Sequence, residues 1–122
     1  MKINIKATNI ELTESIRNYA FKRLEGIDKI LGVPTDEVVG QIEVGKINNH
    51  HKSGDIFRAE VNLSGGGHSL FAVSEKDDLH AAIDKVHDEI IAEAKKSRGK
   101  EKSLVRRGGQ AAKNVIKGLF GR

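Results

Sequence analysis

The amino end of the chain alternates between apolar and polar residues. Ile3, Ile5 and Ala7 are each separated by one polar residue, and this period of two predicts a half-buried strand over residues 2–7. Three further strands are predicted, at residues 38–47, 57–63 and 68–74. The third alternates cleanly, whereas the fourth has apolar residues on both of its faces. Gly65-Gly66-Gly67 predicts a tight reversal between them.

Two longer segments have the helical period instead. After Thr13, which can cap a helix, one apolar stripe runs through Ile16, Ala20, Leu24, Ile27 and Leu31 until Gly32 and Pro34 end it. This spacing predicts a single helix. A second stripe begins at Leu79 and reaches Ala94, with acids before its start and Lys95, Lys96 and Arg98 at its end.

The predicted order is β-α-β-β-β-α, which is typical of an α+β fold. We expect a two-layer sandwich in which a four-stranded sheet carries both helices on one face. The first helix would join two parallel strands by a right-handed crossover. Residues 1–98 would form this domain, and residues 99–122 a basic carboxyl-terminal tail, either disordered or containing a short amphipathic helix at 110–120.

Composition narrows the class of protein further. The 122 residues suffice for one domain, and the absence of cysteine excludes disulfides, thiolate zinc sites and cysteine nucleophiles. No apolar run has membrane-spanning length, and the alternating amino end does not resemble a signal peptide. We therefore expect a cytoplasmic protein.

Charge is divided unevenly along the chain. Residues 1–94 hold 11 Lys and Arg against 16 Asp and Glu, whereas residues 95–122 hold 10 Lys and Arg against Glu101 alone. The overall net charge of +4 is therefore the sum of an acidic body and a strongly basic end. A basic block of this kind favours a polyanionic partner, either nucleic acid or an anionic membrane surface.

Motifs for catalysis are weak. His80, Asp84 and His87 would share one side of the second helix, but a metal would need another ligand, and packing or hydrogen bonding is the simpler interpretation. The triple glycine leads into a strand, not into the helix that a phosphate-binding loop requires. No serine stands in a nucleophile motif. We predict no enzyme activity, no cofactor, no metal and no small-molecule substrate, with a small metal-dependent enzyme as a remote alternative.

Binding remains the better interpretation of the basic residues. Lys95, Lys96, Arg98 and Lys100 lead away from the second helix, and Lys22 and Lys29 lie on the first. Such residues bind phosphates with little sequence preference, and few aromatics are present for base stacking. Two alternatives stay open. One is a solvated charged surface, and the other is a membrane- or protein-docking module that acts through residues 110–120.

Two segments resemble a known family. The opening Ile5-x-x-x-x-Ile10-x-Leu12-Thr13-x-Ser15-Ile16-Arg17 and the segment Asp78-Leu79-His80-Ala81-Ala82-Ile83-Asp84 are similar to the ribosome hibernation promoting factor family, which includes the ribosome-associated translation inhibitor. The resemblance covers residues 1–98 and the element order. His80 stands where the family usually has tyrosine.

The resemblance implies a ribosome-binding factor that is not an enzyme. It would occupy the mRNA and tRNA channel of the small ribosomal subunit, contact its rRNA and silence translation, and it would be monomeric off the ribosome. The family's basic helix positions correspond here to Arg17, Arg23, Lys29, Lys85, Lys95, Lys96, Arg98 and Lys100. Glu89 and Ala92 depart from the usual basic residues, and residues 99–122 are too few for the ribosome-pairing domain of long members.

Overall fold

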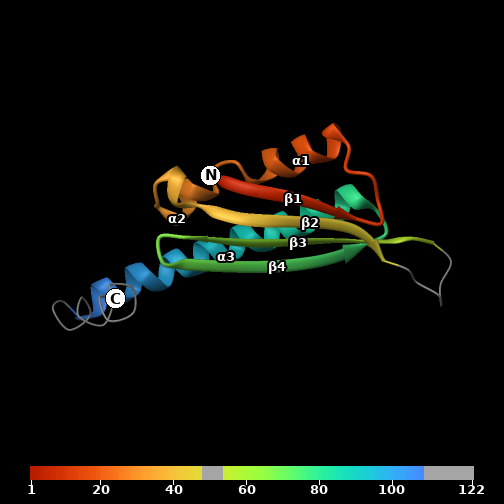
Figure 1. Ribbon diagram of the computed structural model, residues 1–122. Coiled ribbons are helices and arrows are strands. Elements are labelled where there is room, and N and C mark those ends of the chain that lie inside the picture. The colour runs from red at the N-terminus through yellow and green to blue at the C-terminus, as the bar shows by residue number, and fades with distance from the viewer. Residues whose placement is uncertain (48–53, 109–122) are drawn as a thin grey trace.

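The computed structural model describes residues 1–47 and 54–108, with side chains up to residue 100. Eight elements follow one another along the chain (Figure 1). They are β1 (Lys2–Thr8), α1 (Glu14–Leu24), α2 (Ile27–Leu31), the 3-10 turn η1 (Thr35–Glu37), β2 (Val39–Ile47), β3 (Ile56–Gly65), β4 (His68–Lys76) and α3 (Leu79–Gly108).

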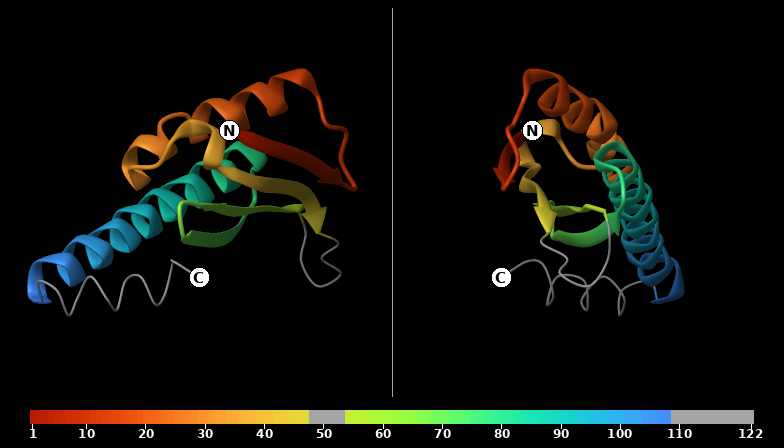
Figure 2. Two further views of the ribbon diagram at one scale, coloured as in Figure 1. Left: turned by 60° about the vertical axis from the view of Figure 1, so that its left-hand side comes forward. Right: turned by 90° about the vertical axis from the view of Figure 1, so that its right-hand side faces the viewer.

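The four strands form one sheet in the order β1-β2-β3-β4. β1 pairs with β2 in parallel, whereas β2–β3 and β3–β4 are antiparallel. The helices lie on the same side of this sheet (Figure 2). The predicted two-layer α+β sandwich is therefore confirmed, including the parallel first pair that the helical crossover requires.

The core lies between the sheet and the helices because each strand turns alternate residues inward. The inner face of the sheet contributes Ile42, Val44, Ala59, Val61, Leu63, Leu70 and Ala72, and the helices contribute Leu24, Ile27, Leu31, Ile83, Val86, Ile90 and Ala94. The opposite side of the sheet, which none of the described helices covers (Figure 2), is called the open face below. It carries residues such as Lys6, Glu60 and Phe71.

The prediction of a single first helix is wrong, because two helices, α1 and α2, stand in its place. Gly26 has a φ of 87°, a left-handed conformation that interrupts the helix between α1 and α2. The apolar stripe continues across this break, with Leu24, Ile27 and Leu31 all buried. A stripe alone therefore did not distinguish one helix from two consecutive ones. The predicted cap is present, since the Ile16 amide donates to Oγ1 of Thr13 over 3.1 Å.

The fourth strand carries apolar residues on both faces, as the sequence indicates, but only one face of β4 is buried. His68, Leu70, Ala72 and Ser74 point into the core, and Phe71 on the other side is 53% exposed. The turn before it forms as predicted, with positive φ at both Gly66 and Gly67.

The helix α3 is longer than the sequence predicted. Its apolar stripe ends at Ala94, but the helix continues through Arg98 to Gly108 and extends past the β3–β4 hairpin (Figures 1 and 2). The division of the chain at residue 98 stays a prediction, and the amphipathic helix expected at 110–120 lies outside the described residues. Within the described part, no helix is both long and apolar enough to cross a membrane.

Candidate nucleic-acid interface

Seven of the nine predicted binding residues are exposed cations on the helical layer. Arg17 and Lys22 belong to α1, Lys29 to α2, and the others to α3, namely Lys85, Lys95, Lys96 and Lys100. Because the helices cover one side of the sheet, the same layer presents all seven to solvent. Phosphate groups could reach these side chains without any rearrangement of the core.

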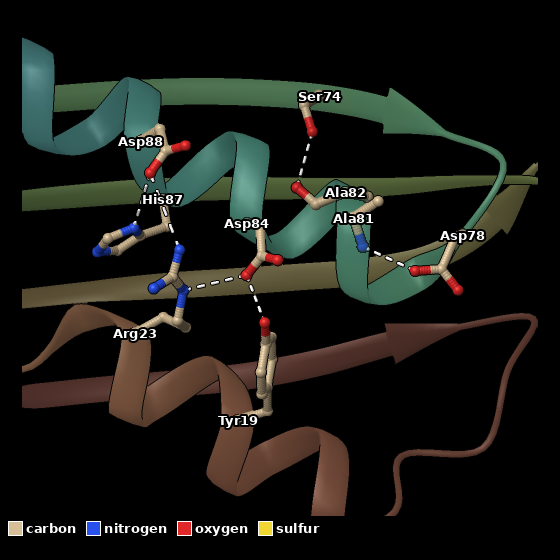
Figure 3. Close-up of polar contacts among 9 residues, drawn as sticks. All are labelled: Tyr19, Arg23, Ser74, Asp78, Ala81, Ala82, Asp84, His87 and Asp88. Atoms are coloured by element: carbon tan, nitrogen blue, oxygen red, sulfur yellow. Dashed lines mark hydrogen bonds and ion pairs between the residues drawn. The ribbon is translucent and has the colours of Figure 1, made fainter.

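The charge of α3 changes sign along its length. Residues 79–94 contain Asp84, Asp88, Glu89 and Glu93 against Lys85 alone, whereas residues 95–108 contain seven Lys and Arg against Glu101. The latter segment is called the basic end of α3. Asp78 caps the acidic beginning, where its Oδ2 accepts the Ala81 amide at 2.9 Å (Figure 3). One continuous helix therefore carries an acidic and a basic segment.

Arg23 is one of two predicted binding residues that the structure uses internally. Its Nε lies 3.1 Å from Oδ1 of Asp84, an ion pair without hydrogen-bond alignment, and its Nη2 lies 3.8 Å from Oδ1 of Asp88 (Figure 3). Arg23 belongs to α1, and both acids belong to α3. The guanidinium therefore joins the two helices, and its charge is largely balanced by the two carboxylates.

Tyr19 extends this cluster by one helical turn. Its hydroxyl donates a hydrogen bond to Oδ1 of Asp84 (Figure 3), and its ring meets the edge of His80 with the ring centres 4.8 Å apart. The hydrogen bond to Asp84, together with burial, raises the pKa of Tyr19 above its usual value. His80, which replaces the tyrosine usual in the resembling motif, therefore packs against a tyrosine from α1.

Arg98 is the second predicted binding residue with an internal role. Its Nη1 donates to the carbonyl oxygen of Leu31 over 3.0 Å, at the carboxyl end of α2. The guanidinium lies so close to Gly32 that a Cβ there would be 2.2 Å from Nη1. Next to it, Nδ1 of His68 lies 2.6 Å from Oγ of Ser97. These contacts attach α3 to α2 and to the start of β4.

The remaining predicted cation in the acidic half, Lys85, has a weak contact within its own helix. Its Nζ lies 3.9 Å from Oε1 of Glu89, one turn further along α3. Glu89 is also the position where the resembling family often has a basic residue. The middle of α3 is therefore poorer in positive charge than its end.

The histidine and aspartate residues of α3 are not arranged as a metal site. Asp84 accepts from Tyr19 and pairs with Arg23, while Nδ1 of His87 lies 3.4 Å from Oδ1 of Asp88. Among the described residues, no group of three His, Cys, Asp or Glu side chains could hold a metal ion. Asp84 instead organises the junction between α1 and α3.

Sequence reasoning did not find this junction, although a pattern was present. Tyr19 and Arg23 stand four residues apart on α1, and Asp84 and Asp88 stand four apart on α3. Residues with that spacing share one face of a helix. The donor pair on α1 is therefore complementary to the acidic pair on α3. This match can be recognised only once the fold has placed the two helices side by side.

A small α+β domain with cations on its helical layer is thus the class of protein that the structure defines. Comparison with known families makes the assignment specific. The profile of the family described as "Sigma 54 modulation protein / S30EA ribosomal protein" matches residues 3–102, and the chain belongs to this family. The expectation from sequence, that the chain is related to ribosome hibernation factors, is confirmed.

Individual relatives agree with this assignment. The chain is 29% identical over 109 residues to a ribosome hibernation promoting factor of Pseudomonas putida, covering 86% of this chain and 94% of that one. It is 31% identical over 100 residues to a ribosome hibernation promotion factor of Picosynechococcus sp., covering 82% of this chain but 50% of the relative. The match to the longer relative is therefore to only half of it.

Solved structures show the same fold. The amino-terminal domain of Thermus thermophilus Protein Y superposes with a TM-score of 0.66 at 26% identity, covering 79% of this chain and 98% of that domain. A ribosomal subunit interface protein of Coxiella burnetii superposes with a TM-score of 0.60 at 19% identity, covering 81% and 99%. The second similarity bears on the fold alone.

Proposed function

We propose that this protein is a ribosome-binding factor without enzymatic activity that occupies the mRNA and tRNA channel of the small subunit and silences translation. Membership of the family and the names of its relatives support ribosome association. The observation that carries the proposal is the basic end of α3, where exposed Lys95, Lys96 and Lys100 follow an acidic half-helix. Such a concentration of charge suits rRNA phosphates.

The binding residues act as separate phosphate contacts. Lys95, Lys96 and Lys100, with Arg17, Lys22 and Lys29 from the preceding helices, are exposed and stand on one layer of the molecule. Each neutralised phosphate releases counterions, so binding weakens steeply as salt is raised. These contacts fix position on the RNA without reading its sequence.

Arg23 and Arg98 contribute to this interface as positioning residues. Arg23 aligns α1 with α3 through Asp84 and Asp88, and Arg98 attaches the basic end to Leu31 of α2. Both arginines therefore set where the exposed lysines stand relative to each other. The protein would act in the cytoplasm, where its ribosomal partner is found, and we expect it to be monomeric off the ribosome.

Sedimentation with purified small subunits tests the proposal. We expect the full chain to sediment with the subunit at low salt, to be released as salt rises, and to compete with mRNA and initiator tRNA. A cell-free translation reaction should lose activity in proportion to the bound protein. Binding that does not weaken as salt is raised would contradict the phosphate contacts. Binding that does not compete with mRNA or initiator tRNA would place the protein outside the channel.

A further inference from the structure

The open face of the sheet has one unusual side chain, Phe71 of β4. The other aromatic residues that the structure describes, Tyr19, Phe21 and Phe57, all pack against the core. Phe71 is instead 53% exposed, the largest value among the large apolar side chains described. Exposing half of an aromatic ring forgoes hydrophobic stabilisation, so packing within the domain does not account for it.

The neighbours of Phe71 on the open face are amides. Asn62 of β3 is its direct cross-strand partner, followed by Gln41 on β2 and Asn4 on β1 in the same row. All three are exposed. A ring flanked by amides offers a stacking surface beside groups that can donate to and accept from the edge of a base.

Charge on the open face is sparse around Phe71 and mixed further along the strands. The rows that contain Phe71 and Val39 carry Lys2 as their one charged residue, whereas the next two rows contain the acids Glu43, Glu60 and Glu75 together with the cations Lys6 and Arg58. The contact of His68 with Ser97 places the start of β4 beside the basic end of α3. Phe71 therefore lies in a part of the open face with little charge of its own, near the basic end of α3, and β4 is an edge strand.

We propose that Phe71 stacks on one unpaired base of an RNA strand whose phosphates are held by the basic end of α3, so that the strand passes around the edge formed by β4. This inference rests on the proposed function, because it takes RNA as the partner. A protein partner suits the surface less well, since Val39 is the only other strand residue among the exposed large apolar side chains described. Two such residues among amides do not make the apolar centre of a stable protein interface.

A tryptophan probe tests stacking directly, because the chain contains no tryptophan. In Phe71→Trp the indole would be the single such fluorophore, and a stacked base should quench it. We expect quenching by a single-stranded oligoadenylate at low salt and none by heparin, a polyanion without bases. Equal quenching by both, or none by an oligoadenylate that is bound, would overturn the proposal.

Affinity measurements provide the second readout. Phe71→Ala should weaken binding to the oligoadenylate about tenfold and leave heparin binding unchanged. Phe71→Tyr should keep the affinity, and Phe71→Leu should lose most of it. The matched control is Val39→Ala, which removes an apolar side chain from the same face and should have no such effect. Equal losses for Val39→Ala and Phe71→Ala would overturn the assignment to stacking.

Ribosome sedimentation separates the two proposals. If Phe71→Trp still sediments with small subunits but no RNA quenches it, the stacking site is wrong and the proposed function stands. If the unmodified chain binds neither ribosomes nor RNA at low salt, the proposed function fails and the stacking site fails with it. If Phe71→Ala loses ribosome binding while no oligonucleotide quenches the probe, Phe71 contacts a protein instead.

Discussion

The two halves of α3 differ in what they contribute. Residues 79–94 bury Leu79, Ile83, Val86 and Ile90 against the sheet and carry mostly acids on the outside. Residues 95–108 follow Ala94, the last buried apolar residue among the side chains that the structure describes, and carry seven Lys and Arg against one acid. A single helix thus packs against the sheet with its first half and concentrates positive charge in its second.

Under the proposed function, this division allows fold and binding to be changed separately. Positive charge near the middle of the helix would compete with the pairing of Arg23, Asp84 and Asp88, which joins α1 to α3. Reversing the charge of Lys95 or Lys96 at the end of the helix would leave that pairing in place. Arg98 is the exception to the division, because it lies in the basic half but contacts α2.

The largest expected effect is on stability in the first half. Ile90→Ala removes a fully buried side chain and should lower the free energy of unfolding by about 2–5 kcal/mol. Urea unfolding measures this directly. Glu93→Ala on the exposed side of the same helix is the control and should change stability by less than about 0.5 kcal/mol. Similar losses for both would contradict the assignment of this half to the core.

The next largest loss of stability is expected for Arg98→Ala. Losing a charged donor to the Leu31 carbonyl should cost about 1.5–3 kcal/mol of stability. The comparison is Lys96→Ala, two residues earlier and exposed, which should leave the unfolding midpoint unchanged. If Arg98→Ala keeps its stability but loses ribosome binding, Arg98 contacts phosphate and does not act through the structure.

Charge reversal in the second half should affect binding. The double variant Lys95→Glu, Lys96→Glu should weaken sedimentation with small subunits about tenfold and make binding less sensitive to salt. Its matched control, Lys2→Glu with Lys6→Glu, reverses the same charge on β1 and should have a much smaller effect. Equal losses would show that net charge matters and that its position does not.

The smallest expected effect concerns Tyr19. Removing its hydroxyl in Tyr19→Phe should cost about 0.5–1.5 kcal/mol at neutral pH. Because folding raises the pKa of Tyr19, its contribution is present below the unfolded pKa and is lost as pH rises through the folded one. The stability difference between wild type and Tyr19→Phe should therefore shrink in alkaline solution. A difference that is independent of pH would contradict the hydrogen bond to Asp84.

Most of the fold followed from local patterns. Alternation predicted β1, β2 and β3 to within a few residues, and Thr13 and the glycine turn formed as expected. The errors arose where a pattern was ambiguous. The stripe through Leu24 and Ile27 did not reveal the break at Gly26, and apolar residues on both faces of the fourth strand did not reveal which face is exposed at Phe71.

The candidate site was less predictable, because its details depend on distant pairs. Arg23 meets Asp84, and Arg98 meets Leu31, each more than 60 positions away in the chain. The i, i+4 spacing of Tyr19 and Arg23 indicates a shared helix face but not the partner helix, and no comparable pattern surrounds Arg98. The exposed lysines were predictable because a solvated cation needs no specific neighbour, and their crowding after Ala94 is visible in the sequence alone.

The parallel pairing of β1 with β2 has a consequence for how the molecule assembles and opens. β2, β3, β4 and α3 are consecutive, whereas β1 reaches β2 only after α1 and α2 have crossed the sheet. β1 is also an edge strand with no fully buried residue. We therefore expect β1 to pair with the sheet late in folding and to detach from it first in local unfolding. Strand pairs that are distant in sequence form slowly, and pairs with little burial open easily. Backbone amides of β1 should therefore exchange with solvent deuterium well before those of β3.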